Sequence, residues 1–368
     1  MSKVSKYSSI HYNSYLQLEK ILSAQDTKSE VVFGKAAHEE TLFIIVHQVY
    51  ELWFKQINHE LYSIHSLFNQ QMVDERNLGV IVGRLDRITT IMDLIVEQIK
   101  VMETMTPLDF LEFRSLLFPA SGFQSFQFRE LEVLLGLKKE RRHTYNNTPY
   151  QEVFNDERKK RLQELEEGPS LRDLLIDWLE RTPFIDLAGF NFVEEYKASV
   201  ARMVESEQQA IRETDVLSEK YKEMRIKMVG DMSNYFASIW DSSYHNQLIE
   251  EGKASFSYDA MVAALFINLY RDEPILQLPF QLLRKIVEID ESLATWRYRH
   301  AQMVMKMLGR KIGTGGSSGH EYLNKTAQKH HIFSDLHNIS TLIIPRNYMP
   351  KLPDHIKENL GFHYKPKS

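Results

Sequence analysis

The sequence predicts an all-α fold, and two observations carry this prediction. Only 15 glycines and 11 prolines occur among 368 residues, so long intervals contain nothing that would break a helix. Within these intervals apolar residues recur at steps of three and four, as in helices, instead of alternating as in strands. We therefore expect a single domain over residues 1–368, built as a bundle of long helices.

The first two long helices are predicted at residues 37–68 and 77–105. Each has one continuous apolar stripe that would face the interior of the bundle. The first stripe consists of Leu42, Val46, Val49, Trp53, Ile57, Leu61, Ile64 and Phe68. The second consists of Ile81, Leu85, Ile88, Ile91, Met92, Ile95 and Ile99.

A third helix should begin directly after Thr106. This residue can act as the N-cap, Pro107 suits the first helical position, and Asp109 completes a capping box. The helix so begun carries Phe110 and Arg114.

Two charged stretches follow. Residues 138–170 contain few apolar side chains, which favours an excursion or lid of marginal order. Residues 199–231 have sparse apolar spacing. There we expect one long charged helix, either as a protruding hairpin arm or oligomer contact or as a solvated helix.

The last long helix is expected from Pro279 to Gly309, because nothing between these two residues would break it. The only extended-looking run is at residues 340–345, and since it is short and closed by a proline, any strand there is marginal.

Composition excludes several functions. A net charge of −5, with both signs mixed along the chain, gives no basic footprint for nucleic acid. Without cysteine there is no disulfide, thiolate metal site or iron–sulfur cluster, so haem or metal would need other ligands. No signal peptide or long apolar run indicates export or a membrane, and we expect a cytoplasmic protein with a small substrate.

His300 shares one face of the last long helix with Leu293, Trp296, Val304 and Met307. It is either a core histidine held by one backbone carbonyl or an axial metal ligand. For a lone imidazole in apolar surroundings the natural cofactor is haem, which needs one strong protein ligand.

The loop at residues 313–319 has four glycines and three hydroxyl side chains in seven residues. Its backbone could approach a ligand closely, and Thr314 could hydrogen-bond a carboxylate or propionate. It matches neither a Walker A loop nor a dinucleotide-binding loop, and it could also be a plain hinge.

Two further side chains suit a flat, charged substrate. His47 shares a face with Phe43, Tyr50 and Phe54, and it is either structural or able to hydrogen-bond an aromatic ligand. Arg114 emerges among apolar neighbours and needs a carboxylate, from a buried acid or from a ligand. The small-residue turn at 119–125 could let a planar ring lie against the backbone.

Four other histidines are interpreted as lying outside the site. His38 is followed by two glutamates, but residue 42 is leucine, so a zinc-binding HExxH motif is absent. The histidines at 330, 331 and 337 are expected at the surface.

Taken together, these residues resemble the tryptophan 2,3-dioxygenase family. The matching blocks run from residue 12 to about residue 350, and their joint specificity is very high. They are residues 12–16, 43–56, 108–114, 119–125, 296–300, 313–319 and 344–346.

The resemblance implies an all-α homotetramer, a dimer of dimers, with haem b held in a pocket of the bundle and ferrous in its active state. In this family the residue matching His300 is the axial haem ligand, and the turn at Ser121 and Gly122, together with Trp296, belongs to the haem site. The residue matching His47 lies on the distal side, near the indole N–H.

The same resemblance implies the substrate contacts. Arg114 matches the arginine that binds the substrate carboxylate, and Thr314 matches a threonine that helps to hold its ammonium group. The matches at Phe43 and Phe110 form the pocket wall. Within an N-terminal segment, residues 1–30, that closes a neighbouring subunit's pocket, the matching residues are Tyr12, Tyr15 and Leu16.

The reaction implied is insertion of both atoms of O₂ across the indole C2–C3 bond of L-tryptophan. Its product is N-formyl-L-kynurenine, in the first step of tryptophan catabolism by the kynurenine route. Two alternatives stay open: a related haem oxygenase acting on another indole, and a non-enzymatic haem or tryptophan sensor.

Overall fold

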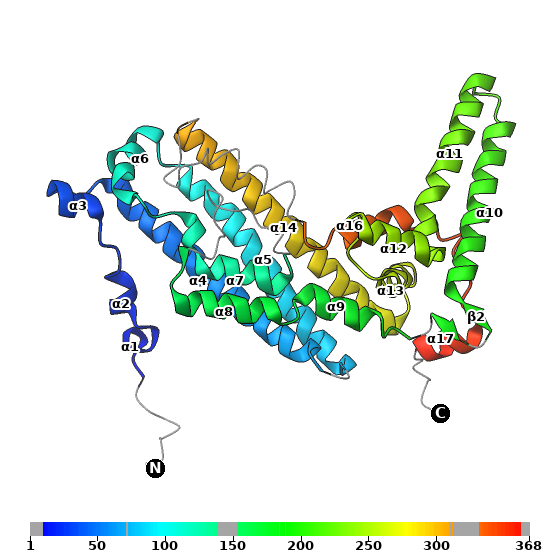
Figure 1. The fold of residues 1–368 in the computed structure, drawn as a ribbon, viewed down its shortest axis with the longest axis horizontal. Coiled ribbons are helices and arrows are strands. Elements are labelled where there is room, and N and C mark those ends of the chain that lie inside the picture. The colour runs from blue at the N-terminus through cyan, green and yellow to red at the C-terminus, as the bar shows by residue number, and fades with distance from the viewer. Residues whose placement is uncertain are drawn as a thin grey trace, which may run out of the picture.

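Three long helices form the frame of the molecule: α4 (His38–Phe68), α5 (Leu78–Met102) and α14 (Gln277–Leu308). They lie side by side, and α5 packs against both of the others (Figure 1). The apolar stripe predicted for α5 is buried along its length, and that of α4 is largely buried. Helix α14 ends at Gly309, whose φ of 57° favours glycine. All three predicted helices are confirmed to within a few residues.

The computed structural model describes residues 10–70, 73–137, 153–183, 185–187, 189–309, 311 and 331–361. Within these ranges the chain is all-α, apart from one short antiparallel pair. This pair joins β1 (Asp186–Leu187) to β2 (Phe190–Asn191) and has no counterpart in the sequence prediction. No helix in the described ranges combines the length and the apolar character needed to cross a bilayer.

Shorter elements cover the frame. They are η1 (Glu75–Asn77), α6 (Pro107–Phe113), η2 (Arg114–Leu117), η3 (Gly122–Gln124), α7 (Phe126–Leu135), α8 (Asp156–Glu167) and α9 (Leu171–Leu179). Helix α6 begins with the predicted capping box, in which Thr106 accepts from the backbone of Asp109 and the Asp109 side chain accepts from the backbone of Thr106.

The charged stretch at 138–170 contains a helix where it is described. Helix α8 occupies most of its second half and packs against α7, with Leu162 fully buried. Leu165 of the same helix is partly buried and also packs against the core, so two leucines dock this charged helix, while the marginal order of the stretch stays a prediction. Residues 138–152 lie outside the described residues.

The charged region at 199–231 is two helices instead of one. Helices α10 (Phe192–Glu213) and α11 (Glu219–Trp240) pack against each other as a hairpin that projects from one end of the molecule (Figure 1). The chain leaves helical geometry at Thr214, whose hydroxyl accepts from the backbone of Val216. Such local bonds compete with helix continuation, so the protruding arm is confirmed and the unbroken helix is wrong.

The C-terminal part closes the end of the bundle from which the arm projects. It consists of α12 (Ser242–Glu250), α13 (Tyr258–Leu269), η6 (Pro274–Leu276), α16 (Ser334–Leu342) and α17 (Asp354–Leu360). The marginal strand at 340–345 is not formed, because α16 continues to Leu342. Its Leu336, Ile339 and Leu342 recur at steps of three and are all buried, so a helix buries them on one face.

At the opposite end, three short helices lead away from the bundle (Figure 1). They are α1 (Tyr12–Leu16), α2 (Leu18–Leu22) and α3 (Lys28–Phe33). The chain joins the bundle near Ser29, whose hydroxyl donates to the buried carboxylate of Glu40 at 2.5 Å. The segment before this anchor is largely exposed.

Candidate functional site

His47 and His300 lie together at one end of the bundle. His47 is near the start of α4 and His300 is near the end of α14, and these two helices run in opposite directions (Figure 1). Helix α6 contacts both of them there. The two imidazoles are close enough to interact electrostatically, although 253 positions separate them in the sequence (300 − 47).

Both imidazoles are neutral at pH 7. Burial, and secondly the neighbouring His47, lower the pKa of His300 to about 4. The pKa of His47 is also lowered by burial, against the opposing effect of its hydrogen bond to Phe43. Many protein atoms lie near both rings, which explains the lowered pKa values. Solvent nevertheless reaches His47, and in part His300, from one side. The two rings therefore border accessible space instead of close-packed core.

The hydrogen bond of His47 fixes which of its nitrogens carries the proton. Nδ1 lies 2.7 Å from the carbonyl oxygen of Phe43, one turn earlier in α4. A carbonyl can only accept, so Nδ1 must donate, and the neutral ring then has its lone pair on Nε2. His47 can thus accept a hydrogen bond from a ligand N–H.

An aromatic wall flanks His47. The Phe43 ring lies 4.1 Å from the His47 ring and 5.8 Å from that of Phe110, measured between centroids. Phe113 completes the group, with its ring 5.7 Å from Phe43 and 5.4 Å from Phe110. The sequence prediction missed Phe113, although its position three residues after Phe110 on the same helix places it on the same face.

His300 has no hydrogen bond to any described residue, so it is not the core histidine held by a backbone carbonyl. Its ring stacks on Trp296 at 5.3 Å with an interplanar angle of 10°. The surrounding apolar cluster consists of Val46, Ile99, Met102, Met105, Phe110, Phe113, Met303 and Met307. A neutral, unpaired imidazole among apolar side chains fits the axial position of a haem.

Arg114 stands at the edge of the aromatic wall. Its backbone N–H donates to the carbonyl of Phe110, so it follows Phe110 by one turn, where α6 tightens into η2. The side chain is partly buried. Leu116 and Leu117, in the same turn, pack against the apolar cluster that also includes Phe110 and Phe113. The backbone thus places Arg114 beside the site, and its ligand remains a prediction.

The turn at 119–125 is held by its own hydrogen bonds. Ser121 caps η3, accepting from the backbone of Phe123 at 3.4 Å and donating its own N–H to Gln124 at 3.3 Å. Phe123 in turn lies under the guanidinium of Arg129, 5.7 Å from its ring centroid. The haem contacts expected of Ser121 and Gly122 stay predictions.

A buried ion-pair network fixes α14 one turn before His300. Glu132 of α7 accepts from Arg297 at 2.8 Å and from Arg129 at 2.6 Å. The side chains of Glu132 and Arg297 are nearly inaccessible to solvent. The sequence prediction missed this network, because Glu132 and Arg297 lie 165 positions apart.

The other predicted site residues lie elsewhere or are not described. Tyr12 and Tyr15 are each 72% exposed in α1, together with Leu16, and Figure 1 shows α1 away from the bundle. They do not join the site of their own chain. Thr314 and the loop at 313–319 lie outside the described residues, as does His330.

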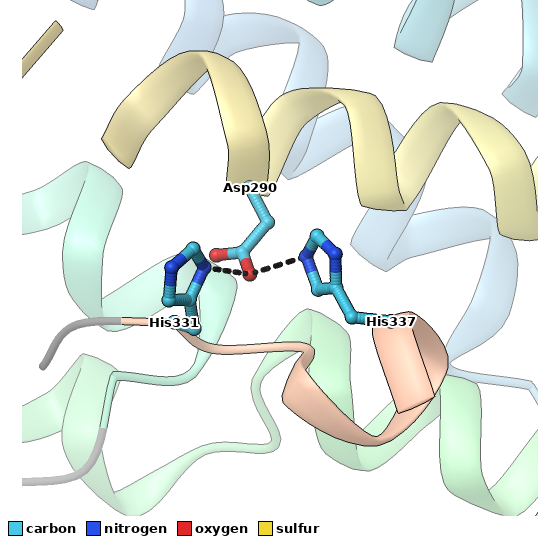
Figure 2. A group of neighbouring side chains, drawn as sticks. All are labelled: Asp290, His331 and His337. Carbon is cyan, nitrogen blue, oxygen red and sulfur yellow. Dashed lines mark hydrogen bonds and ion pairs between the residues drawn. The ribbon is translucent and has the colours of Figure 1, made fainter. Parts of the chain in front are cut away.

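His331 and His337 were predicted at the surface, and both are partly exposed, but they also pack against a buried acid. Both contact the buried carboxylate of Asp290 on α14, from a nitrogen 3.2 Å away in each case (Figure 2). The sequence could not show this, because the carboxylate lies more than 40 positions from either histidine.

Comparison with known proteins identifies the family of this chain. The family model described as tryptophan 2,3-dioxygenase matches residues 2–343. The chain is 46% identical to a tryptophan 2,3-dioxygenase of Bdellovibrio bacteriovorus, over 98% of this chain and 100% of the relative. It is also 46% identical to that of Dictyostelium discoideum, over 96% and 88%, and 44% identical to tryptophan 2,3-dioxygenase B of Danio rerio, over 94% and 85%. With its two neutral histidines at one end of an all-α bundle, the chain belongs to the tryptophan 2,3-dioxygenase family.

Proposed function

We propose that this protein is a haem-dependent dioxygenase that converts L-tryptophan and O₂ to N-formyl-L-kynurenine. The observation that carries the proposal is the pair of neutral histidines, His47 and His300, beside accessible space and an aromatic wall. The names of the relatives give the substrate class. Both oxygen atoms enter the product, at indole C2 and C3, so the overall reaction needs no external reductant.

His300 is the proposed axial ligand. Its imidazole is neutral, lacks a hydrogen bond to the described residues and stacks on Trp296, so the lone pair of one nitrogen is available. The chain has no cysteine that could compete for iron. When bound, the haem supplies the iron chemistry that activates O₂. We assign Trp296, Ser121 and Gly122 to its surroundings.

His47 is the proposed partner of the substrate's indole. Its Nε2 is the accepting nitrogen, because Nδ1 donates to Phe43. An indole N–H can only donate, so the two groups are complementary. His47 then orients the ring without removing the indole proton. Phe43 and Phe110 provide flat apolar surface on which the indole can pack.

Arg114 and Thr314 are proposed to hold the amino-acid end of the substrate. A guanidinium can bind a carboxylate through two parallel hydrogen bonds, which fixes direction as well as position. A threonine hydroxyl can accept from the ammonium group. With the amino-acid end held by Arg114 and Thr314 and the indole held by His47, the C2–C3 bond stays in one place. Such orientation can lower the activation free energy by several kcal/mol.

The proposed assembly is a homotetramer, a dimer of dimers, in which residues 1–30 cover a neighbouring subunit's pocket. Apolar side chains are exposed along this segment, with Tyr12 and Tyr15 at 72% and Leu22 at 73%. Exposed apolar groups in such density are typical of an interaction surface. The segment also leads away from its own bundle, as intersubunit exchange requires (Figure 1).

An absorption spectrum tests the function in one cuvette. The reduced, haem-loaded protein is kept under air, L-tryptophan is added, and the near-ultraviolet band of N-formylkynurenine is followed. We expect a Soret band together with growth of the product. A Soret band without product would overturn the proposal in favour of another indole substrate or a sensor, and failure to bind haem would overturn the assignment of His300.

A further inference from the structure

A second group of histidines lies outside the proposed haem site. Asp290 comes from the middle of α14, His331 from the segment just before α16, and His337 from α16 itself (Figure 2). One carboxylate oxygen, Oδ2 of Asp290, is 3.2 Å from Nδ1 of His331 and 3.2 Å from Nε2 of His337. The three side chains thus converge on one small volume.

We propose that Asp290, His331 and His337 bind a divalent transition-metal ion of the zinc class. Two imidazoles and one carboxylate are a common ligand set for such ions. Potential ligand atoms of the three residues all lie within 4.8 Å of one another. In a tetrahedral zinc site with bonds of about 2.0–2.1 Å, neighbouring ligand atoms are roughly 3.3 Å apart. Both oxygen–nitrogen separations here are 3.2 Å, so an ion needs little rearrangement of these pairs.

The groups behind the three ligands also suit a metal. The backbone N–H of Ile332 donates to Oδ1 of Asp290 at 3.0 Å, and that of Phe333 donates to Oδ2 at 3.4 Å. These two bonds orient the carboxylate, whose Oδ2 also faces both histidines. Beyond His337, a carboxylate oxygen of Glu291 lies 3.6 Å from Nδ1. A carboxylate near the remote nitrogen is the arrangement that commonly supports a metal-bound histidine.

Charge and access favour a cation at this place. The Asp290 side chain is fully buried and forms no ion pair with a lysine or arginine among the described residues. A buried carboxylate of this kind gains from a cation beside it. The nearest competing charge, on Arg297, is paired with Glu132 at 2.8 Å. His331 and His337 are 41% and 24% exposed, so an ion can enter from solvent, and water can supply the fourth ligand.

The ion would act as a clamp between two parts of the chain. Asp290 belongs to the bundle frame, and the two histidines belong to the C-terminal cover formed by α16. Ten residues separate Asp290 from His300, which is about 15 Å along a helix. The proposed ion is therefore separate from the haem, and its binding can be measured without tryptophan turnover.

Zinc binding tests the proposal directly. The haem-loaded protein, made without a histidine tag, is treated with a chelator, and zinc chloride is titrated in a calorimeter. The bound metal is then counted by mass spectrometry. We expect one zinc per chain besides the haem iron, and a rise in the melting temperature when zinc is present.

Two variants and a control separate a metal site from a hydrogen-bonded cluster. His331→Gln and His337→Gln keep a side-chain N–H that can reach Asp290 but lose the imidazole. Each variant should lower the zinc affinity by at least about 10- to 100-fold, which is the typical effect of losing only a group that hydrogen-bonds a metal ligand. His355→Gln, at an exposed position on α17, should leave the affinity unchanged.

A spectroscopic readout on the unaltered protein covers the case in which a variant fails to fold. Zinc-edge X-ray absorption should show nitrogen and oxygen ligands at about 2.0–2.1 Å with the outer scattering of imidazole. No zinc uptake, a spectrum without imidazole, or equal zinc affinity in folded His337→Gln would each overturn the proposal. The cluster would then be a hydrogen-bonded clamp only.

Discussion

Two groups of histidines that lie beside α14 have opposite surroundings. At the end of α14, His300 stacks on Trp296 near His47, and burial lowers its pKa to about 4. Ten residues earlier, Asp290 hydrogen-bonds His331 and raises the pKa of that imidazole. His47 and His300 are neutral and have nitrogen lone pairs available to a ligand, whereas His331 and His337 already hydrogen-bond the carboxylate of Asp290. The surroundings of an imidazole, and not its presence on a helix, therefore decide what it can bind.

The largest effect is expected from removing the imidazole of His300, the assigned axial ligand of the haem. His300→Ala should abolish tryptophan turnover and most haem retention, because it removes the nitrogen assigned as the axial ligand. The Soret absorbance per chain and the rate of N-formylkynurenine formation measure both losses. Free imidazole in the buffer should restore part of the haem binding.

His65→Ala is the matched control. His65 is also a histidine of lowered pKa, but its Nε2 lies 3.0 Å from the carbonyl oxygen of Leu134, so its hydrogen bond is made within the protein. This change should lower stability and leave the haem spectrum intact. A normal Soret band and turnover in His300→Ala would refute the assignment of the axial ligand.

Local patterns in the sequence were sufficient for the frame of the fold. The periodicity of α4, α5 and α14 predicted these helices, because a long helix with one buried face must repeat its apolar residues. It failed at Thr214 and at α16. At Thr214 a single polar side chain decides the structure. In α16 only three apolar residues carry the helical period, which is too few for the pattern to stand out.

The candidate site divides along the same line. His47 and His300 were singled out because each stands on an apolar face of its own helix, whereas their roles and the place of Phe110 in the pocket wall came from the family resemblance. The pairs Glu132–Arg297 and Asp290–His331 were missed, because their members are 165 and 41 positions apart and each looks like an ordinary surface charge in its local sequence. Tertiary packing alone brings such partners together.

The second prediction tests whether this hidden network supports the haem end of α14. Glu132→Gln removes the negative charge between two guanidinium groups, of which Arg297 is almost fully buried. Breaking a buried ion pair in this way typically costs about 3–5 kcal/mol. Chemical denaturation should show a loss of that size in the free energy of unfolding.

An exposed pair provides the comparison for that measurement. Glu97→Gln breaks only the surface ion pair with Lys100, and should cost at most about 1 kcal/mol. If both variants lost the same small amount, the buried network would not be important for holding α14 in place.

The third prediction concerns the substrate carboxylate. Arg114→Ala should lower kcat/KM for L-tryptophan roughly 30- to 5000-fold. This corresponds to about 2–5 kcal/mol of lost transition-state stabilisation, as expected when one partner of a buried charge pair is removed. Tryptamine lacks the carboxylate, so with this substrate the variant and the parent should differ little. An equal loss with both substrates would show that Arg114 acts on the protein structure instead.

The smallest effect is expected at His47, where the geometry indicates one hydrogen bond to a neutral N–H. His47→Ala should reduce kcat/KM roughly 2- to 13-fold, which corresponds to the loss of one hydrogen bond of about 0.5–1.5 kcal/mol. The decisive comparison uses 1-methyl-L-tryptophan, which has no indole N–H to donate. With that substrate the alanine variant should lose nothing relative to the parent, since no hydrogen bond is available to either protein. A loss of several thousandfold with L-tryptophan would mean that His47 removes the indole proton, and its role would then be catalysis of proton transfer and not orientation.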